Sequence, residues 1–302
     1  MKFISSPYES SKRNSHCVDI DLIVTEPSLD PNNTLTYTEY VNWIDQWMEE
    51  CKRVLTASGS IYIICAWESS SLYHSVLGKK FIVQSRITAE RQIEINGPDA
   101  YAFVRYVQPR NLEKCEIGSC KYIILTDMDG GIINDACLLR LEEERFWISP
   151  GDGDVILWLQ GIAVNSGMNV SIHEPDVSPL QISGPKSGKL IQKLFNGEHD
   201  ALGYYKAKQT SLENIPMVIA RTGWSGELSY ELYLQDRKLG NQLFELVNDA
   251  AEEFNGRVIA PNIIRTIEGG LLSYGGDFGR EHNPYTIGLG RLVDLDQEFD
   301  FI

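Results

Sequence analysis

The sequence predicts an α+β fold, and two patterns along the chain support this prediction. Near the N-terminus, two short apolar strands flank a stretch in which apolar residues recur at helical spacing. Farther along, an alternating strand that closes with Gly-Pro and is followed by a helix-like stretch occurs twice, at residues 91–107 and 180–195. This weak internal repeat predicts two related α+β halves.

The N-terminal elements form a strand, a helix and a second strand. Asp21–Thr25 is a short apolar strand, and Pro27 breaks it. Between residues 41 and 55 the apolar positions follow helical spacing, which predicts a helix that ends at Ser58-Gly59. Residues 60–65 are apolar enough for a second, buried strand. A strand, helix and strand of this length make a βαβ unit with parallel strands.

The larger part of the chain adds a hairpin, a Gly-rich motif and two helices. Residues 121–135 indicate a strand, a Gly-Gly turn and a returning strand. Residues 221–234 combine a Gly-rich turn with a strand-like run. Helices are expected at about residues 238–254, with Gly240 in the first turn, and at about residues 261–273.

Size and charge limit the classes of protein to which the chain can belong. Its 302 residues suggest two or three domains, and a hydrophobic content of 43% is enough for a buried core. The net charge of −15 argues against a general nucleic-acid binder, which needs a basic face. It still permits an anionic small ligand, because that needs only a local cluster of Arg or Lys. We therefore expect a small-molecule partner and no nucleic acid, while the oligomeric state stays open.

The cysteines and histidines show no metal-site or disulfide pattern. None of the six cysteines forms a C-x-x-C pair, which favours free thiols in a reducing cytoplasm. The five histidines are scattered without zinc-ligand spacing, so no metal site is expected. No signal peptide and no apolar stretch of membrane-spanning length is recognisable. These features predict a cytoplasmic protein.

One carboxylate, Glu231, lies in the strand-like run directly behind a turn that carries Trp224. A buried carboxylate is costly unless it meets matching donors. The donor edge of a pterin is one such match, because a single carboxylate can accept its two N–H bonds side by side. A cross-strand ion pair is the alternative for Glu231, and simple packing in the turn is the alternative for Trp224.

The stretch from Arg221 to Leu234 closely resembles the folate-binding motif of the glycine-cleavage T-protein family, and the resemblance covers about residues 79–302. Within this family, the sequence most resembles the dimethylsulfoniopropionate demethylase branch. The segments that support this resemblance to the demethylase branch are Gln108-Pro-Arg-Asn-Leu112, Glu174-Pro-Asp-Val-Ser-Pro179, Leu271-Leu-Ser-Tyr-Gly-Gly-Asp-Phe278, Glu281-His-Asn-Pro284, and Asn134 before Asp135. The resemblance implies tetrahydrofolate as the cofactor.

The resemblance also implies an architecture. In the family, two related lobes belong to a three-lobed ring with folate in the central channel. Residues 79–302 would form these two lobes, and the third, β-rich lobe is expected to be missing, because the chain stops at Ile302 where the family enters it. Residues 85–88, Ser-Arg-Ile-Thr, stand where the family has a Trp-Asp-Val-Ser-like turn beside the active site.

Where the motifs of the family match this sequence, the resemblance implies a catalytic residue and several binding residues. Asp135 is the family's central carboxylate near the reactive nitrogen, and Cys137 would lie beside the same pocket. The cofactor-binding residues would be Tyr122, Glu231, Arg265, Tyr274 and Arg221, and the substrate-binding residues would be Trp224, Tyr204 and Tyr205. A surface hairpin is the alternative for the acids, and an ordinary surface pair with Glu268 is the alternative for Arg265.

About residues 18–68 resemble a different family, the DNA amino-methyltransferases. In that family the first strand runs into Asp-Pro-Pro-Tyr, whereas residues 26–29 here are Glu-Pro-Ser-Leu, without the aromatic that stacks a flipped base. The Gly-rich turn that receives S-adenosylmethionine is also missing, since Gly59 is the only glycine before Gly78. Residues 1–77 are therefore interpreted as a partial βαβ segment, either a structural remnant or a fusion.

The resemblance of about residues 79–302 to the T-protein family implies a tetrahydrofolate-dependent methyl (one-carbon) transferase. Its substrate would be dimethylsulfoniopropionate or a related sulfonium or methylamine-type compound. A sulfonium methyl group is already activated, because its leaving group is a neutral thioether, so positioning can carry most of the catalysis. The alternatives are a non-catalytic folate-binding protein and, remotely, a DNA amino-methyltransferase that uses S-adenosylmethionine.

Overall fold

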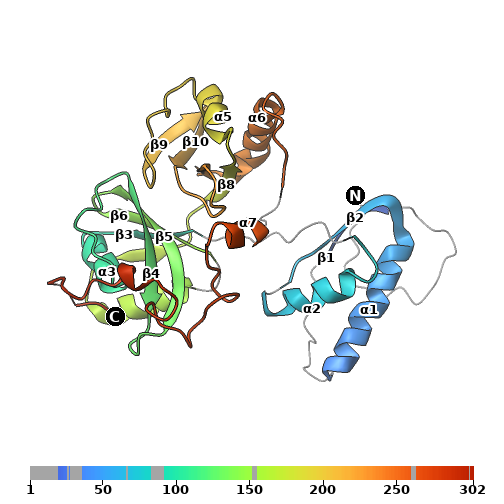
Figure 1. Cartoon of the computed structure of the whole chain (residues 1–302), viewed down its shortest axis with the longest axis horizontal. Coiled ribbons are helices and arrows are strands. Elements are labelled where there is room, and N and C mark those ends of the chain that lie inside the picture. Colours follow the sequence, from blue (N-terminus) through green and yellow to red (C-terminus); the bar gives the residue numbers. More distant parts are fainter. Residues whose placement is uncertain are drawn as a thin grey trace. The chain divides into compact units, whose positions relative to one another are not determined.

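The computed structural model describes residues 20–25, 27, 36–65, 67–82, 92–151, 155–259, 263–298 and 300–302 (Figure 1). The chain divides into two units, Met1–Ser85 and Arg86–Ile302. None of the helices in the described part of the chain is both long and apolar enough to cross a membrane.

The N-terminal unit contains two parallel strands and two helices. Its elements are β1 (Ile20–Thr25), α1 (Tyr37–Val54), β2 (Leu55–Ile63) and α2 (Trp67–Leu77). β1 pairs in parallel with β2, which confirms the predicted strand direction. A capping box begins α1, because the Thr36 hydroxyl accepts from the Glu39 N–H at 3.3 Å and the Glu39 carboxylate accepts from the Thr36 N–H at 2.8 Å. Ile44 and Met48 of α1 pack with Tyr73 of α2 in the core of this unit.

The boundary between α1 and β2 differs from the prediction. The helix ends at Val54, and Ser58-Gly59 lies within the strand instead of ending the helix. Leu55 is already extended, with φ −75° and ψ 139°, and it pairs with Ile20. The register then shifts before Leu22 pairs with Ser60, so Ser58-Gly59 falls in the irregular part of the ladder. Pairing with β1 therefore keeps Ser58-Gly59 in a strand, although this dipeptide by itself favours a turn.

The first sheet of unit Arg86–Ile302 has five strands in the order β4-β5-β6-β3-β7. Neighbouring strands are antiparallel, and their bounds are β3 (Ile93–Asn96), β4 (Ser119–Thr126), β5 (Ile132–Glu142), β6 (Arg145–Pro150) and β7 (Ser171–His173). The helices α3 (Ala100–Tyr106) and α4 (Val155–Ser166) contribute Phe103 and Leu159 to a core shared with Ile95 and Ile123 of the sheet. The predicted hairpin at residues 121–135 is confirmed as β4 and β5.

The second sheet has four antiparallel strands in the order β8-β11-β10-β9. Its elements are β8 (Ser178–Ser183), β9 (Ala207–Leu212), β10 (Ile215–Ala220), β11 (Ser229–Leu234), α5 (Ser187–Leu194), the 3-10 turn η1 (Arg237–Leu239) and α6 (Gly240–Glu252). Leu190 of α5 and Leu243 of α6 pack against Met217 and Leu232 of the strands. The helix expected near residues 238–254 is thus present, and Gly240 begins it.

The strand, glycine and helix pattern that suggested a repeat occurs in both sheets. Gly97 follows β3 with φ +130° and precedes α3, and Gly184 follows β8 with φ +119° and precedes α5. Glycine adopts these values without the strain that a Cβ would cause. The same backbone device therefore connects a strand to its covering helix twice.

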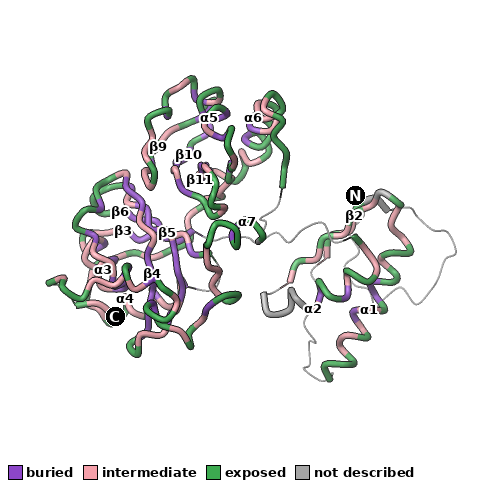
Figure 2. The backbone as a smooth tube through the Cα atoms, in the orientation of Figure 1, coloured by how far each residue is buried: buried purple, intermediate pink, exposed green. Residues whose placement is uncertain are grey.

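The two sheets share a buried cluster, which brings strands from distant parts of the sequence together. Leu139 and Trp147 of the first sheet pack with Val218 and Tyr233 of the second. The rings of Trp147 and Tyr233 have centroids 5.9 Å apart. Figure 2 shows the buried backbone of β4 and β5 that belongs to this interior.

The C-terminal segment contains α7 (Ile263–Glu268) and the 3-10 turn η2 (Gly290–Leu292). The predicted helix at residues 261–273 is wrong at its end, because α7 stops at Glu268. Gly270 then takes φ +66°, and a Cβ on Gly269 would lie 3.1 Å from the Gly226 Cα. Close backbone contact with the Gly-rich turn therefore decides where this helix ends. Residues 260–262 lie outside the described part of the chain.

Candidate functional site

Two adjacent strands place a tyrosine beside a buried aspartate. In the β4–β5 ladder, Tyr122 pairs with Cys137 and Ile124 pairs with Asp135, so the four side chains share one face of the sheet. The Tyr122 hydroxyl donates to Asp135 Oδ2 at 2.7 Å. Asp135 is 8% exposed. The predicted pair is therefore in contact, and Asp135 is buried rather than turned toward water.

Burial decides the electrostatics of this pair. It raises the pKa of Asp135, and the hydrogen bond from Tyr122 lowers that pKa by a smaller amount. Burial together with the Asp135 charge raises the pKa of Tyr122 well above its usual value, so the phenol stays protonated and donates. A carboxylate with a raised pKa is suited to accept and hold a proton near neutral pH.

The second carboxylate, Glu231 on β11, is held by two donors on a single oxygen. Thr222 Oγ1 donates to Glu231 Oε2, and Tyr233 Oη donates to the same oxygen at 3.0 Å. No hydrogen-bond partner of Oε1 is found among the residues that the structure describes. Burial raises the pKa of Glu231, whereas the bonds from Thr222 and Tyr233 lower it. One oxygen is thus fixed by the protein, and the other is available to a ligand.

The turn before β11 depends on glycine. Gly223 has φ +145°, and a Cβ there would lie 2.5 Å from the Ser229 Cβ. The hydroxyls of Ser183 and Ser225 contact that of Ser229 at 2.8 and 2.9 Å and brace the turn. Trp224 is 41% exposed at the tip, so it is not part of a packed core.

Cys137 lies on the same face of β5 as Asp135, and the charge of Glu231 acts on its thiol. A hydrogen bond with Cys120 and burial raise the pKa of its thiol well above the usual value, and the Glu231 charge raises it further. Because Cys137 pairs with Tyr122 on β4–β5 while Glu231 is on β11, the side chains of the two sheets approach one another here. The structure therefore brings Tyr122, Asp135 and Glu231 to one region of this unit.

Tyr205 belongs to the same region. Its N–H donates to the Arg221 carbonyl at 3.1 Å, and its carbonyl accepts from the Cys120 N–H at 2.8 Å, so it lies where the two sheets meet. Burial, followed by the charge of Cys137, raises the pKa of its phenol. Its φ of +57° is uncommon for a residue with a side chain, which is a feature of strained functional positions. Tyr204 stacks edge-on against it at 4.7 Å but is 73% exposed.

The arginines expected at the site have different surroundings. Arg221 donates through Nη1 to the Leu202 carbonyl at 3.1 Å, and its buried Nε has no hydrogen-bond partner among the described residues. Arg265 is exposed on α7 and forms ion pairs with Glu227 at 3.3 Å and Glu268 at 3.7 Å. Arg265 thus forms the surface ion pair with Glu268 that was the alternative to ligand binding. Arg221 differs, because its buried Nε donates to none of the described residues.

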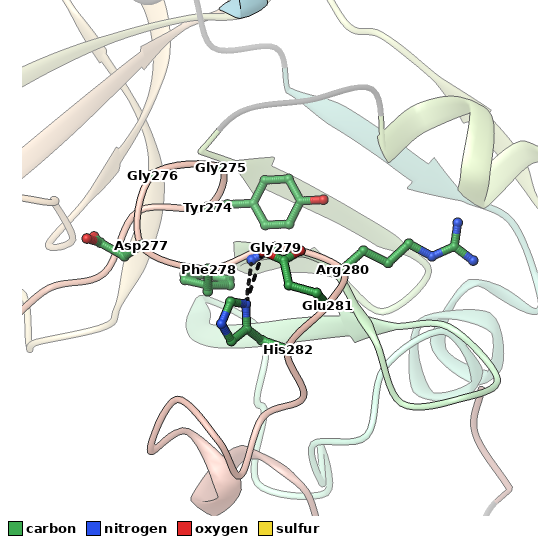
Figure 3. A pocket seen from close by; sticks show the side chains of 9 residues that line it. All are labelled: Tyr274, Gly275, Gly276, Asp277, Phe278, Gly279, Arg280, Glu281 and His282. Atoms are coloured by element: carbon green, nitrogen blue, oxygen red, sulfur yellow. Dashed lines mark hydrogen bonds and ion pairs between the residues drawn. The ribbon is translucent and has the colours of Figure 1, made fainter.

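Tyr274 lies in the C-terminal segment. It forms an isolated β-bridge with Phe278, and the two rings meet edge-on at 5.6 Å. Tyr274 also packs in the cluster of Ile124 and Tyr122. Residues 274–282 line a pocket, in which the Gly279 N–H donates to His282 Nδ1 at 3.3 Å (Figure 3).

Sequence reasoning missed the residues that orient the site. Thr222 and Tyr233 stand in the motif around Glu231, but nothing in the sequence shows that both donate to the same oxygen. Five cysteines are free thiols, as predicted, while Cys17 lies outside the described residues. In the described part of the chain, no group of three or more His, Cys, Asp and Glu side chains has the geometry of a metal site.

Comparison with family models gives two matches. The GCVT N-terminal domain matches residues 86–297, and the DNA methylase family matches residues 1–111.

Two characterised relatives and one solved structure are similar to the chain. Dimethylsulfoniopropionate demethylase DmdA from Ruegeria pomeroyi is 34% identical over 213 residues, covering 70% of this chain and 58% of the demethylase. An aminomethyltransferase from Streptomyces avermitilis is 25% identical over 247 residues, covering 78% of this chain and 66% of the relative. The crystal structure of glycine cleavage system aminomethyltransferase T from Bartonella henselae superposes with a TM-score of 0.61 at 21% identity, over 68% of this chain and 56% of that one. The chain thus shares the fold of that protein and spans less than two thirds of these relatives.

Proposed function

The chain belongs to the family of the GCVT N-terminal domain, and from this premise we propose that it is a tetrahydrofolate-dependent methyl (one-carbon) transferase. The proposed methyl donor is dimethylsulfoniopropionate or a related sulfonium compound. The similarity to the demethylase from Ruegeria pomeroyi supports this choice of donor. The proposed catalytic residue is Asp135.

One structural observation carries the proposal. The Tyr122–Asp135 pair on the first sheet and the Glu231 carboxylate on the second approach each other around Cys137. Burial raises the pKa of both carboxyl groups, which is typical of catalytic and binding sites rather than of surface acids. Acids on a solvent-facing hairpin would have no such shift.

The residues around Glu231 fit a reduced pterin. Oε2 already accepts bonds from Thr222 and Tyr233, so Oε1 is the oxygen that can accept from a ligand. A pterin edge carries two adjacent N–H donors, and a charged acceptor binds such donors strongly. Because Oε2 is already occupied, the side-by-side pairing expected from the sequence is replaced by acceptance at Oε1 alone. We propose that Glu231 binds this edge, with Tyr122, Tyr274 and Arg221 as further contacts and Arg265 at the periphery. Arg221 is a candidate because its buried Nε lacks an acceptor.

The chain's own residues have separate roles in the proposed reaction. Tetrahydrofolate, when bound, supplies the nitrogen that accepts the methyl group. Asp135 accepts at a carboxylate oxygen the proton that must leave, and the Tyr122 hydroxyl orients that carboxylate. Trp224 and the adjacent pair Tyr204 and Tyr205 are the proposed sources of an aromatic face for a sulfonium cation. Alignment of donor and acceptor supplies the main part of the rate enhancement.

The same proposal gives a role to each of the two parts of the chain and names a partner and a cellular location. Residues 79–302 are the folate-binding region, composed of two related lobes. Residues 1–77 are a segment derived from a DNA-methyltransferase-like fold. The partner is a small molecule, and the proposed location is the cytoplasm, where reduced folate and free thiols are compatible.

Two measurements test the proposal. Calorimetry with tetrahydrofolate under reducing conditions measures binding, and formation of 5-methyltetrahydrofolate from dimethylsulfoniopropionate measures turnover. Binding with turnover supports the transferase. Binding without turnover for any sulfonium or methylamine donor identifies a non-catalytic folate-binding protein. Absence of binding contradicts both.

A second candidate function rests on the match of residues 1–111 to the DNA methylase family. It would require S-adenosylmethionine binding by the N-terminal unit. Residues 26, 28 and 29 of the altered Asp-Pro-Pro-Tyr position lie outside the described part of the chain. Titration with S-adenosylmethionine decides this candidate, and we expect no binding because the sequence lacks the Gly-rich turn.

A further inference from the structure

Two arginines beside Tyr122 have no acidic partner. Arg110 donates through Nη1 to the Tyr122 carbonyl at 2.5 Å. Arg291 lies in η2, which packs against β4 next to the cluster that contains Tyr122. Among the residues that the structure describes, neither guanidinium forms a salt bridge with a carboxylate.

The position of Arg110 is built by the fold. Gln108 is 0% exposed, and its side chain bonds both backbone groups of the arginine, accepting from the Arg110 N–H at 2.8 Å and donating to the Arg110 carbonyl at 2.7 Å. The Pro109 carbonyl accepts from the Asp294 N–H and from Gln297 Nε2, each at 3.0 Å. The loop that carries Arg110 is thereby fastened to the segment that carries Arg291.

The two guanidinium groups influence one another. Burial lowers the pKa of Arg110, and the like charge of Arg291 lowers it further. The charge of Arg291 also acts on the Tyr122 phenol. Arg110 is partly buried and Arg291 is exposed, so the repulsion between the two cations is screened on one side, and an anion between them would reduce it. Arginine is also the side chain that best matches the two oxygens of a carboxylate.

The arginines adjoin the proposed catalytic region. Tyr122 accepts from Arg110 at its carbonyl and donates to Asp135 through its hydroxyl. Tyr205 and Cys137 are close enough to Arg110 to affect its pKa by their charges. Arg110 and Asp135 thus both contact Tyr122, one at its backbone and the other at its side chain.

We propose that Arg110 and Arg291 together bind a carboxylate of the small molecule that occupies this region. The proposal rests on the proposed function and adds to it two binding residues and the chemical group that they recognise. Two sources offer this group, the propionate end of the sulfonium donor and the glutamyl tail of tetrahydrofolate. Neither arginine was assigned a role by the sequence motifs.

The experiment measures dissociation constants by calorimetry for wild type, Arg110→Gln, Arg291→Gln, the double variant and the control Arg257→Gln. Arg257 is exposed and outside this region, and its substitution changes the charge by the same amount. The probes form two pairs, dimethylsulfoniopropionate with ethyldimethylsulfonium, and tetrahydrofolate with 6-methyltetrahydropterin. The second member of each pair lacks the carboxylate in question.

We expect each single variant to weaken binding of one carboxylate-bearing probe by about 10- to 100-fold, the usual loss for a charge-assisted bond. Binding of its carboxylate-free counterpart should not change. A loss confined to dimethylsulfoniopropionate assigns the donor's carboxylate, and a loss confined to tetrahydrofolate assigns the glutamyl tail. Arg291→Gln is the cleaner variant, because this side chain makes no hydrogen bond to the described part of the protein that its removal could disturb.

Equal affinities in wild type and double variant for all four probes overturn the arginine proposal while leaving the proposed function intact. An equal loss for both members of a pair also overturns it, because the effect would then be independent of the carboxylate. A wild-type protein that binds none of the four probes overturns the proposed function and the arginine proposal with it.

Discussion

Burial raises the pKa of both Asp135 and Glu231, but the two carboxyl groups differ in their hydrogen-bond donors. Asp135 has one side-chain donor, Tyr122, whereas Glu231 has two donors that converge on one oxygen. More donors stabilise the charged form and fix its orientation, while fewer leave the group able to take up a proton. The difference supports the proposal that Glu231 serves recognition and Asp135 handles the proton.

The largest effect is expected for Asp135→Asn. An amide keeps the shape and still accepts from Tyr122, but it cannot take up a proton, so turnover should fall by about 100- to 10,000-fold. Tetrahydrofolate affinity should change far less. Formation of 5-methyltetrahydrofolate and calorimetry measure the two quantities, and unchanged turnover would remove Asp135 from the catalytic role.

A smaller effect, on binding rather than chemistry, is expected for Glu231→Gln. Loss of the charged acceptor should weaken tetrahydrofolate binding by about 10- to 100-fold, corresponding to about 1.5–3 kcal/mol for a bond to a charged group. Glu245→Gln on the exposed face of α6 is the matched control. If the two variants bind tetrahydrofolate equally well, Glu231 does not contact the pterin.

The orientation of Glu231 can be tested through Thr222. Thr222→Val keeps the shape but removes one hydrogen bond to the charged form, so the pKa of Glu231 rises. Tetrahydrofolate affinity, which needs the charged carboxylate, is lost as the pH falls through this pKa. The midpoint of that loss should therefore move to higher pH, by up to about one pH unit.

Thr222→Ser restores the hydroxyl and should return the midpoint to the wild-type value, whereas a merely structural effect would not depend on the hydroxyl. Tyr233→Phe should move the midpoint in the same direction as Thr222→Val. A midpoint that is identical in all these variants contradicts the assigned role of the two donors.

The smallest effect concerns stability. Both carboxyl groups have a folded-state pKa above the unfolded value, so the folded protein binds more protons between the two values. Their contribution is therefore fully present below the unfolded pKa and is lost as the pH rises through the folded pKa. Asp135→Asn and Glu231→Gln should each flatten this decline.

Urea unfolding between pH 5 and pH 7.5 measures this decline as a change in the free energy of unfolding. Each variant should lose less stability than wild type over that range. A decline as steep as that of wild type would mean that the two carboxyl groups do not carry the raised pKa values.

Local sequence patterns predicted much of the fold and some individual residues of the proposed site. The β4–β5 hairpin, β11 and the two glycine-linked strand–helix pairs lie where alternation and turn residues predicted them. The predicted spacing of Tyr122 and Asp135 translates directly into a contact, because both belong to one hairpin whose register the turn sets. The predictions that failed, the ends of α1 and α7, depended on contacts with distant segments.

The sequence by itself determined the strand and helix types, the glycines that permit left-handed turns and the motif around Glu231, because these follow from periodicity and backbone sterics within a few residues. Only the tertiary structure decided that the strands of Asp135 and Glu231 share one buried cluster, and that the segments of Arg110 and Arg291 both lie against β4. Those arrangements arise from packing between segments far apart in the chain, and no local pattern records which buried faces will meet.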